Sequence, residues 1–217
     1  WENCGEMTED GYIQPAQKYL DPMFFRKPGL PLLMVEMADG SRIPYWNTFY
    51  QEIRDTDDYH TRYLGQMDLN IKSEKVWDFY RETIKKLAGY GAKIIRLDAF
   101  AYAPKAPGRA NFLNEPETWE FLEQIHKLAK PYGIRLLPEI HAGYKEKKYE
   151  LIAQKGYLTY DFFLPGLILD ALYRGDGTYL EQWAKEQIKE NIHTVNMLGC
   201  HDGIPVLDLA GLLPDDR

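Results

Sequence analysis

Acidic residues close three apolar runs of this sequence that have the composition of β-strands. The first run, residues 93–100, contains Arg96 and Asp98 two positions apart. Because side chains alternate between the two faces of a strand, we expect these two residues to point the same way. A neighbouring cation favours the ionised aspartate, which suits either a nucleophile or a structural ion pair. The run by itself leaves both interpretations open.

Glu139 and Asp202 belong to the other two runs, residues 134–143 and 193–202. The carboxyl ends of parallel strands meet at one face of a barrel, where such folds build their active sites. We therefore expect Asp98, Glu139 and Asp202 to share one site. Three salt-bridged carboxylates without a catalytic role are the competing interpretation.

One ionised and one protonated carboxyl group in a neutral cleft can cleave a glycosidic bond. Asp98 is the better nucleophile, because Arg96 would keep it charged. Glu139 is the better acid, because it follows an apolar run that disfavours its ionised form. Asp202, beside His201, would bind sugar hydroxyls and stabilise the positive charge of the transition state.

The composition describes a folded chain without a basic surface. Of the 217 residues, 45% are hydrophobic and 14% aromatic, enough for the core of one domain, with or without an appendage. The formal net charge of -7 argues against nucleic acid or an anionic membrane as the main partner. A neutral sugar fits better. Some aromatic side chains could stack on its rings, although most should fill the core.

Cys4 and Cys200 are the only cysteines, and neither has metal-ligand spacing around it. We expect free thiols in a reducing compartment, and therefore a cytoplasmic protein. We also expect no metal and no cofactor. No run approaches the roughly 20 apolar residues of a membrane span, and no signal segment precedes the first strand. The chain begins at Trp1 without a methionine, which we interpret as the start of an excised piece of a longer protein.

Residues 1–65 lack the regular alternation of the remaining chain. Residues 32–37 and 42–46 predict two short strands around a turn. Residues 51–62 are dense in charge, which indicates a solvated loop or a short surface helix, with an acidic metal site as the less favoured alternative. We predict a small, irregular, partly β subdomain over residues 1–65.

Residues 66–217 alternate strands with helices and are predicted to form an α/β fold. Strands carry Asp98, Glu139 and Asp202, and a further strand is expected within residues 157–165. Helices are expected at residues 73–89, at 114–132 with Asn114 as the cap, and at 149–154, 167–173 and 178–190. Right-handed crossovers would make neighbouring strands parallel. Four strands cannot close a barrel that needs eight, so the chain is either half a barrel or a small open sheet.

Three motifs at the acidic residues resemble a known family. IRLDAF, LPEIHA and LGCHDG are similar to the second, third and fourth signature regions of the α-amylase superfamily, glycoside hydrolase family 13. The likeness is greatest to sucrose phosphorylases and related glucosyl phosphorylases, in which a tyrosine follows the nucleophile as Tyr102 follows Asp98. RKPGLP at residues 26–31 resembles their RPRPGLP. Phe49 and Gln66 stand where they have a sugar-stacking aromatic and a glutamine.

The resemblance implies a (β/α)8 TIM barrel, with residues 66–217 as about strands 4 to 7 and residues 1–65 as an inserted subdomain. It also implies a retaining double displacement, with Asp98 as nucleophile, Glu139 as acid and then base, and Asp202 as transition-state stabiliser. The residues implied to line the glucosyl pocket are Arg96, His201, Phe49, Gln66 and Tyr102. His141 would lie nearer the acceptor, and a loop histidine without a role is the alternative.

The implied reaction is glucosyl transfer from sucrose or a similar α-glucoside to inorganic phosphate, so the expected partners are small molecules. Lys27 stands where the family has an arginine that meets phosphate, and lysine brings charge without a bidentate fork. Residues 51–65 also exceed the family's corresponding segment, and its first signature region is absent. A hydrolase or transglucosidase, and less favourably a non-catalytic barrel segment, are the alternatives. We expect the piece alone to be inactive, because it supplies only half the pocket.

Overall fold

The computed structural model describes residues 5–7, 13–15, 33–45, 48–54, 61–65, 68–105, 112–200 and 202–217. Cys4, Lys27, Gln66 and His201 lie outside these residues. The chain forms two compact units. The first unit is Trp1–Tyr90 with Ala101–Leu128, and the second unit is Gly91–Phe100 with Ala129–Arg217. The predicted domain boundary after residue 65 remains a prediction.

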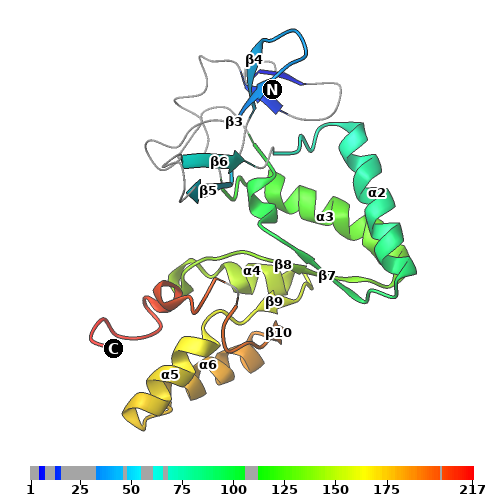
Figure 1. Cartoon of the computed structure of the whole chain (residues 1–217). Helices are drawn as coiled ribbons and strands as arrows, with labels where there is room; N and C mark the ends of the chain where they lie inside the picture. Colours follow the sequence, from blue (N-terminus) through cyan, green and yellow to red (C-terminus); the bar gives the residue numbers. More distant parts are fainter. Residues whose placement is uncertain are drawn as a thin grey trace. The chain divides into compact units, whose positions relative to one another are not determined.

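Three antiparallel strand pairs occupy the early part of the first unit (Figure 1). They are β1 (Gly5–Met7) with β2 (Ile13–Pro15), β3 (Leu33–Glu36) with β4 (Arg42–Tyr45), and β5 (Tyr50–Arg54) with β6 (Thr61–Gly65). The β3–β4 pair confirms the predicted strands around a turn. Asp39 stabilises this turn by accepting hydrogen bonds from the backbone N–H and the hydroxyl of Ser41 at 2.9 and 2.6 Å.

The β5–β6 pair shows that the prediction for residues 51–62 was wrong at residues 51–54 and 61–62, the part of this segment that the structure describes. Instead of a solvated loop or a helix, these residues contribute to two paired strands, with Ile53 opposite Arg62. Charge density misled the prediction, because a strand with one solvated face accepts charged side chains between its aromatic and β-branched residues. The acidic residues of the alternative metal site at 55, 57 and 58 lie outside the described residues.

Two amphipathic helices complete the first unit. Helix α2 (Glu74–Gly89) begins directly after Ser73, as predicted. Helix α3 (Glu117–Ala129) begins three residues later than predicted. The Asn114 amide donates to the backbone carbonyl of Pro104 at 2.9 Å. The helices pack through Trp77 and Phe121, whose ring centroids lie 5.8 Å apart.

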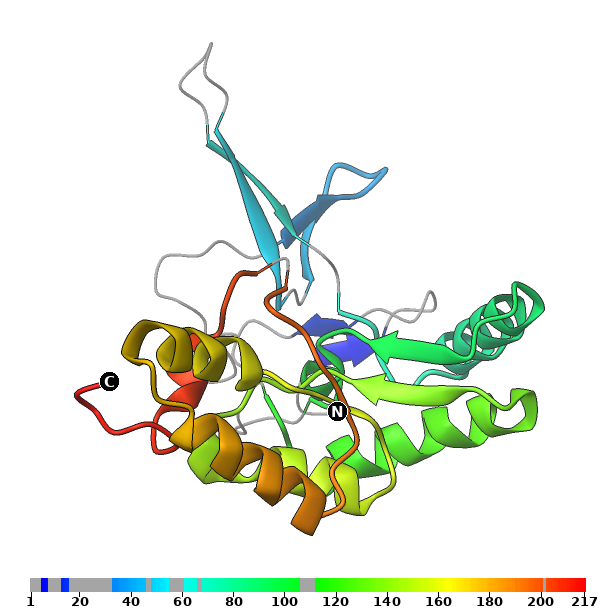
Figure 2. The same ribbon diagram turned by 90° about the horizontal axis from the view of Figure 1, so that it is seen from below.

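The second unit contains two pairs of parallel strands. Strand β7 (Ile94–Leu97) pairs with β8 (Arg135–Pro138), and β9 (Thr159–Tyr160) pairs with β10 (Thr194–Val195). The parallel direction agrees with the predicted crossovers. Strands β8 and β9 are neighbours, but within the described ranges the two pairs remain separate sheets (Figures 1 and 2). The α/β class is therefore observed, in short sheets.

The strands are shorter than the sequence patterns predicted. Strand β7 covers only the centre of residues 93–100 and is not fully buried as expected, since Ile94 is 48% exposed. Among the described residues it pairs on one side only. Strand β10 ends at Val195, so Asp202 lies in a loop rather than at a strand end. Asn196 and Gly199 follow β10, and both residue types disfavour an extended strand.

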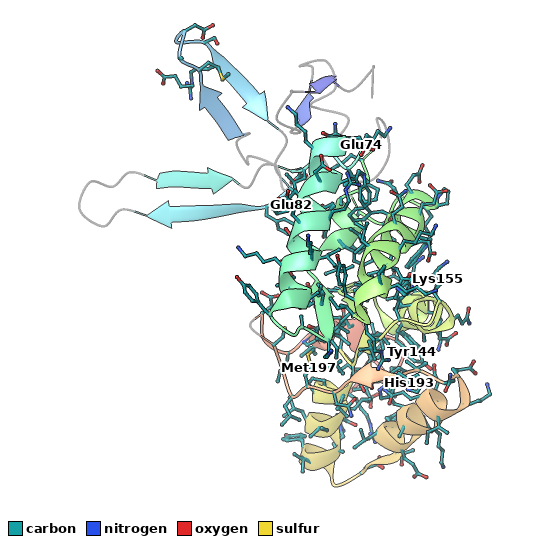
Figure 3. All side chains as sticks on the ribbon, turned by 90° about the vertical axis from the view of Figure 1, so that its right-hand side faces the viewer. Glu74, Glu82, Tyr144, Lys155, His193 and Met197 are labelled. Carbon is teal, nitrogen blue, oxygen red and sulfur yellow. The ribbon has the colours of Figure 1, made fainter. Side chains whose placement is uncertain are left out.

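Helices α4 (Lys148–Gln154), α5 (Leu164–Arg174) and α6 (Thr178–Lys189) agree with the predicted helical segments, and α5 begins three residues earlier. Short 3-10 turns are η2 (Phe100–Tyr102), η3 (Lys130–Tyr132), η4 (Tyr144–Glu146) and η5 (Val206–Leu209). Tyr144, labelled in Figure 3, packs against the core and donates its hydroxyl to Glu186 at 2.5 Å. Its core cluster consists of Tyr149, Phe163, Leu167, Trp183, Ile192, Leu209 and Leu212.

The described residues bear on the expected thiol state of the chain and on whether it contains a membrane-spanning helix. Cys200 is a free thiol, as predicted. No helix within the described ranges has both the length and the apolar character that crossing a membrane requires.

A buried carboxylate joins the elements of the second unit. Asp161, which is 1% exposed, follows β9 and accepts a 2.9 Å hydrogen bond from the backbone N–H of Leu164 in the first turn of α5. It also accepts from the indole N–H of Trp183 at 3.0 Å and from the amide of Gln187 at 2.7 Å, both on α6. One side chain therefore ties β9 to two helices.

We predict that Asp161→Ala destabilises the protein by about 3 kcal/mol, because it leaves buried donors without an acceptor. The free energy of unfolding in urea is the measurement. Asp78→Ala, on the exposed face of α2, is the matched control and should cost much less. Equal losses in the two variants would contradict the assignment of Asp161 as a structural tie.

Candidate active site

Arg96 joins two of the carboxylates that the sequence singled out. Its Nη2 lies 2.8 Å from Oδ1 of Asp98 and 2.6 Å from Oε2 of Glu139. The β7–β8 register explains this arrangement. Leu97 and Pro138 are the last residues of the two strands and lie opposite each other, and Asp98 and Glu139 are the residues that follow them. Asp98 and Glu139 therefore leave the sheet at the same edge, and Arg96 and Asp98 lie together as the strand pattern predicted.

Burial differs strongly between the two carboxylates. The Glu139 side chain is 9% exposed and the Asp98 side chain 70% exposed. Burial of Arg96 favours its neutral form, but the hydrogen bond to Glu139 and the charges of both carboxylates raise its pKa above the ordinary value. Arg96 is therefore a permanent cation, and it makes the surroundings of Glu139 more polar than the preceding apolar run suggested.

His141 and Asp202 extend this cluster. Nε2 of His141 lies 3.6 Å from Oε1 of Glu139, and Nδ1 lies 3.5 Å from Oδ2 of Asp208. One nitrogen of His141 and one oxygen each of Glu139 and Asp202 lie within 4.8 Å of one another. The structure thus brings Asp98, Glu139 and Asp202 together with Arg96 and His141, all inside the second unit.

The charges around His141 decide what this cluster can bind. The carboxylate of Asp208 raises the pKa of His141 above its ordinary value, against the effect of partial burial, and Glu139 and Asp202 add to the increase. An imidazole and two carboxylates at these distances are also a possible donor set for a divalent metal. A protonated imidazole has no lone pair for a metal. With Arg96 already paired to Glu139, the geometry favours an ion-pair cluster.

Three residues of the cluster were missed by the sequence analysis. Tyr160 lies close to Arg96; burial raises its pKa, and the positive charge of Arg96 opposes that increase. Phe162 stacks on His141 with ring centroids 4.0 Å apart. Tyr160 and Phe162 are two positions apart after an apolar run, so the strand period could have indicated them. Asp208 lies in η5, where no periodic pattern marks it.

The predicted aromatic residues of the glucosyl pocket lie in the first unit. Phe49 is 42% exposed, and its ring lies edge-on to Tyr102 at a centroid distance of 5.2 Å. Tyr102 in turn contacts Phe112 at 4.8 Å. The structure thus brings two of the predicted pocket residues together. Lys27, Gln66 and His201 lie outside the described residues, and their roles remain predictions.

The buried side chain of Lys105 contacts the residue before Phe49 and the backbone of Tyr102, and so connects the two segments that carry this aromatic pair. The side chain of Lys105 is 1% exposed, and its Nζ lies 3.0 Å from Oδ2 of Asp68. It donates to the hydroxyl of Thr48, the residue before Phe49, at 2.9 Å and to the carbonyl oxygen of Tyr102 at 2.5 Å. Asp68 also accepts the backbone N–H of Thr48 at 3.0 Å. The sequence analysis gave no indication of this ion pair.

The whole chain is similar in sequence to known phosphorylases. No protein-family model matches it. It is 53% identical over 221 residues to sucrose 6(F)-phosphate phosphorylase of Ilumatobacter coccineus, in a match covering 99% of this chain and 42% of that protein. It is 37% identical over 204 residues to sucrose phosphorylase of Streptococcus mutans, covering 94% of this chain and 39% of that protein.

A solved structure gives the same result. The crystal structure of sucrose 6F-phosphate phosphorylase from Thermoanaerobacter thermosaccharolyticum matches with a TM-score of 0.75 and 34% identity, over 95% of this chain and 41% of that one. The chain therefore spans about two fifths of the length of these relatives. The chain therefore belongs to glycoside hydrolase family 13 and, within it, to the sucrose phosphorylase group, as its motifs predicted.

We predict that Lys105→Met destabilises the protein by about 3 kcal/mol, because it leaves Asp68 as an uncompensated charge in a largely buried place. Unfolding in urea is again the measurement. Lys75→Met, an exposed lysine of α2, is the matched control. The double variant Lys105→Met with Asp68→Asn should recover part of the loss, since it removes both charges. A double variant as unstable as the sum of its single variants would contradict a direct interaction.

Proposed function

We propose that this chain is the central part of the catalytic domain of a glucosyl phosphorylase. The proposed donor is sucrose or its 6F-phosphate, and the proposed acceptor is inorganic phosphate. The names of the relatives support both donors, since the compared proteins include a sucrose phosphorylase and sucrose 6(F)-phosphate phosphorylases. Because the chain spans about two fifths of those proteins, the activity is proposed for a longer protein that contains it.

The observation that carries this proposal is the position of Arg96 between two carboxylates. Asp98 and Glu139 contact the same nitrogen, Nη2, at 2.8 and 2.6 Å. Their contacting oxygens are therefore separated by at most the sum of these distances. That limit agrees with the roughly 5–5.5 Å between the carboxyl groups of retaining glycosidases and lies below the ~6.5–9.5 Å of inverting ones. The geometry supports transfer with retention at the anomeric carbon.

In the proposed first step, Asp98 attacks the anomeric carbon of the glucosyl unit while Glu139 protonates the oxygen that leaves with fructose. Asp98 suits the attack because its carboxylate is exposed and paired with a cation. Glu139 needs a proton for this step, so its contact with Arg96 would be released on substrate binding. In the second step Glu139 takes a proton from phosphate, which attacks the glucosyl ester and yields glucose 1-phosphate.

The remaining site residues are assigned supporting roles. Asp202 would stabilise the positive charge of the oxocarbenium-like transition state. Arg96, Phe49 and Tyr102 would bind the glucosyl unit, and His141 would lie on the acceptor side of Glu139. The roles implied for Gln66 and His201 in the glucosyl pocket, and for Lys27 near phosphate, are also proposed.

The proposed fold of the longer protein is a (β/α)8 barrel. Strands β7, β8, β9 and β10 would be about strands 4 to 7 of that barrel, and residues 1–65 would form an inserted subdomain. The TM-score of 0.75 to a phosphorylase of this group supports the proposal. It would also account for the exposure of Ile94, which a preceding barrel strand would cover.

A hydrolase or transglucosidase is the second candidate, and Lys27 is the observation that favours it. The same three carboxylates would serve water or a sugar as the acceptor. A lysine in place of the family's arginine meets phosphate as a point charge, without a bidentate fork. The acceptor therefore has to be measured.

We predict that the intact protein releases glucose 1-phosphate from sucrose or sucrose 6F-phosphate only when inorganic phosphate is present. Glucose 1-phosphate and free glucose are followed separately, and comparison of the two donors defines the preferred one. The isolated 217-residue chain is the control and should show no turnover. Free glucose formed at a rate independent of phosphate would reject the phosphorylase proposal in favour of a hydrolase.

We predict that Glu139→Ala lowers phosphorolysis by about a hundredfold or more, because the acid and base are lost. With α-glucosyl fluoride as the donor, whose leaving group needs no acid, azide should restore turnover because it needs no general base, and it should give the α-glucosyl azide, with retained configuration. Glu82→Ala, at an exposed position of α2 labelled in Figure 3, should leave the rate unchanged. A β-glucosyl azide would show instead that Glu139 is the nucleophile.

A further inference from the structure

Asp208, whose side chain is 16% exposed, is a largely enclosed carboxylate close to His141 that the proposed reaction does not use. Its Oδ2 atom is buried and makes no hydrogen bond of good geometry with any described residue. Nδ1 of His141 lies 3.5 Å from this oxygen, long for a hydrogen bond but within ion-pair distance. A buried carboxylate oxygen is costly unless a cation compensates its charge. The imidazolium form of His141 provides that cation.

The backbone around Asp208 is firmly held. Its neighbour Leu209 is 5% exposed and belongs to the core cluster of the second unit. Leu209 lies against Gly166 of α5 so closely that a Cβ at that glycine would collide with its side chain. The main chain at Asp208 is therefore fixed independently of His141. This rigid support lets Asp208 determine how the imidazole is oriented.

The other side of the imidazole is equally constrained. Phe162 stacks on its face at 4.0 Å, which restricts rotation of the ring. With Nδ1 directed at Asp208, Nε2 is directed at Glu139, 3.6 Å away. The charged groups that face His141 are Asp208 from η5, Glu139 from the end of β8, and Asp202 from the loop after β10. Arg96, bound to the far oxygen of Glu139, is the nearby opposing cation.

We propose that Asp208 is a positioning residue that orients His141 toward Glu139 and holds it as a cation on the acceptor side of the site. This inference rests on the proposed function, which places the acceptor next to Glu139. A cationic His141 would attract an anionic acceptor such as phosphate and would have little effect on neutral water. Asp208 would thereby favour phosphorolysis over hydrolysis of the glucosyl intermediate.

The sign of the pH dependence follows from the same contacts. The Asp208 carboxylate raises the pKa of His141, so His141 remains protonated to a higher pH than an ordinary histidine. Removing the charge of Asp208 should lower that pKa. The cationic form, and with it the affinity for phosphate, should then be lost at a lower pH than in the unchanged protein.

The test compares Asp208→Asn with Asp208→Glu in the intact protein, using the imidazole resonances of His141 in an NMR pH titration. The His141→Gln variant assigns these resonances among the 5 histidines of the chain and those outside it. We expect the pKa of His141 to fall in Asp208→Asn and to be largely restored in Asp208→Glu, which keeps the charge. Asp215→Asn, an exposed acid of the same segment, should leave it unchanged. An unchanged His141 pKa in Asp208→Asn would overturn the proposal.

Steady-state kinetics give a second readout. Asp208→Asn should raise KM for phosphate on the order of five- to tenfold, as expected for one lost charge interaction, while the slow release of free glucose without phosphate stays the same. Equal loss of both rates would indicate a merely structural role and would contradict the proposal. The NMR titration needs no turnover, so it tests Asp208 even if the intact protein proves not to be a phosphorylase.

Discussion

Two carboxylates can lie side by side in this structure because one guanidinium group lies between them. Without Arg96, the like charges of Asp98 and Glu139 would repel each other without a compensating cation. The parallel register of β7 and β8 creates this arrangement, since each carboxylate is the first residue after its strand. The rest of the second unit has to keep these two strand ends in place.

The two carboxylates differ in their burial and in the side chains that contact them. Glu139 is buried and bordered by Arg96 on one side and His141 on the other, whereas Asp98 is exposed in the turn after β7. The same chemical group thus stands in two different surroundings, in agreement with the two roles proposed for it, an accessible nucleophile and an enclosed acid. His141 is in turn confined by Phe162 and Asp208. The position of Glu139 thus depends on contacts with groups on several elements.

Local patterns in the sequence were sufficient to predict much of this arrangement. The strand period placed Arg96 and Asp98 on one side, and helical periodicity located α2, α4 and α6 closely. The prediction failed where tertiary contacts decide the outcome. Strand β10 ends long before Asp202, and the charged residues Glu52 and Arg54 belong to a strand pair.

Contacts between distant segments were also beyond the sequence analysis. Asp208 meets His141, and Lys105 meets Asp68, across long stretches of chain whose approach depends on the whole fold. Asn114 has the residue type of a helix cap, yet its amide bonds to Pro104 because that carbonyl lies within reach. Motif resemblance identified the family because it depends on short motifs around the three acidic residues, and the comparisons with known proteins agree with it.

In the proposed reaction, Asp98 forms a covalent bond to glucose, and Glu139 first donates a proton to the leaving group and then accepts one from phosphate. The most direct measurement uses the intact Glu139→Gln variant with α-glucosyl fluoride, whose leaving group needs no acid. The glucosyl ester should then accumulate, because the base that normally assists its breakdown is missing. Mass spectrometry of the digested protein should find one glucosyl group on the peptide that contains Asp98. A glucosyl group on the Asp202 peptide, or fluoride release with inversion and no adduct, would contradict the account.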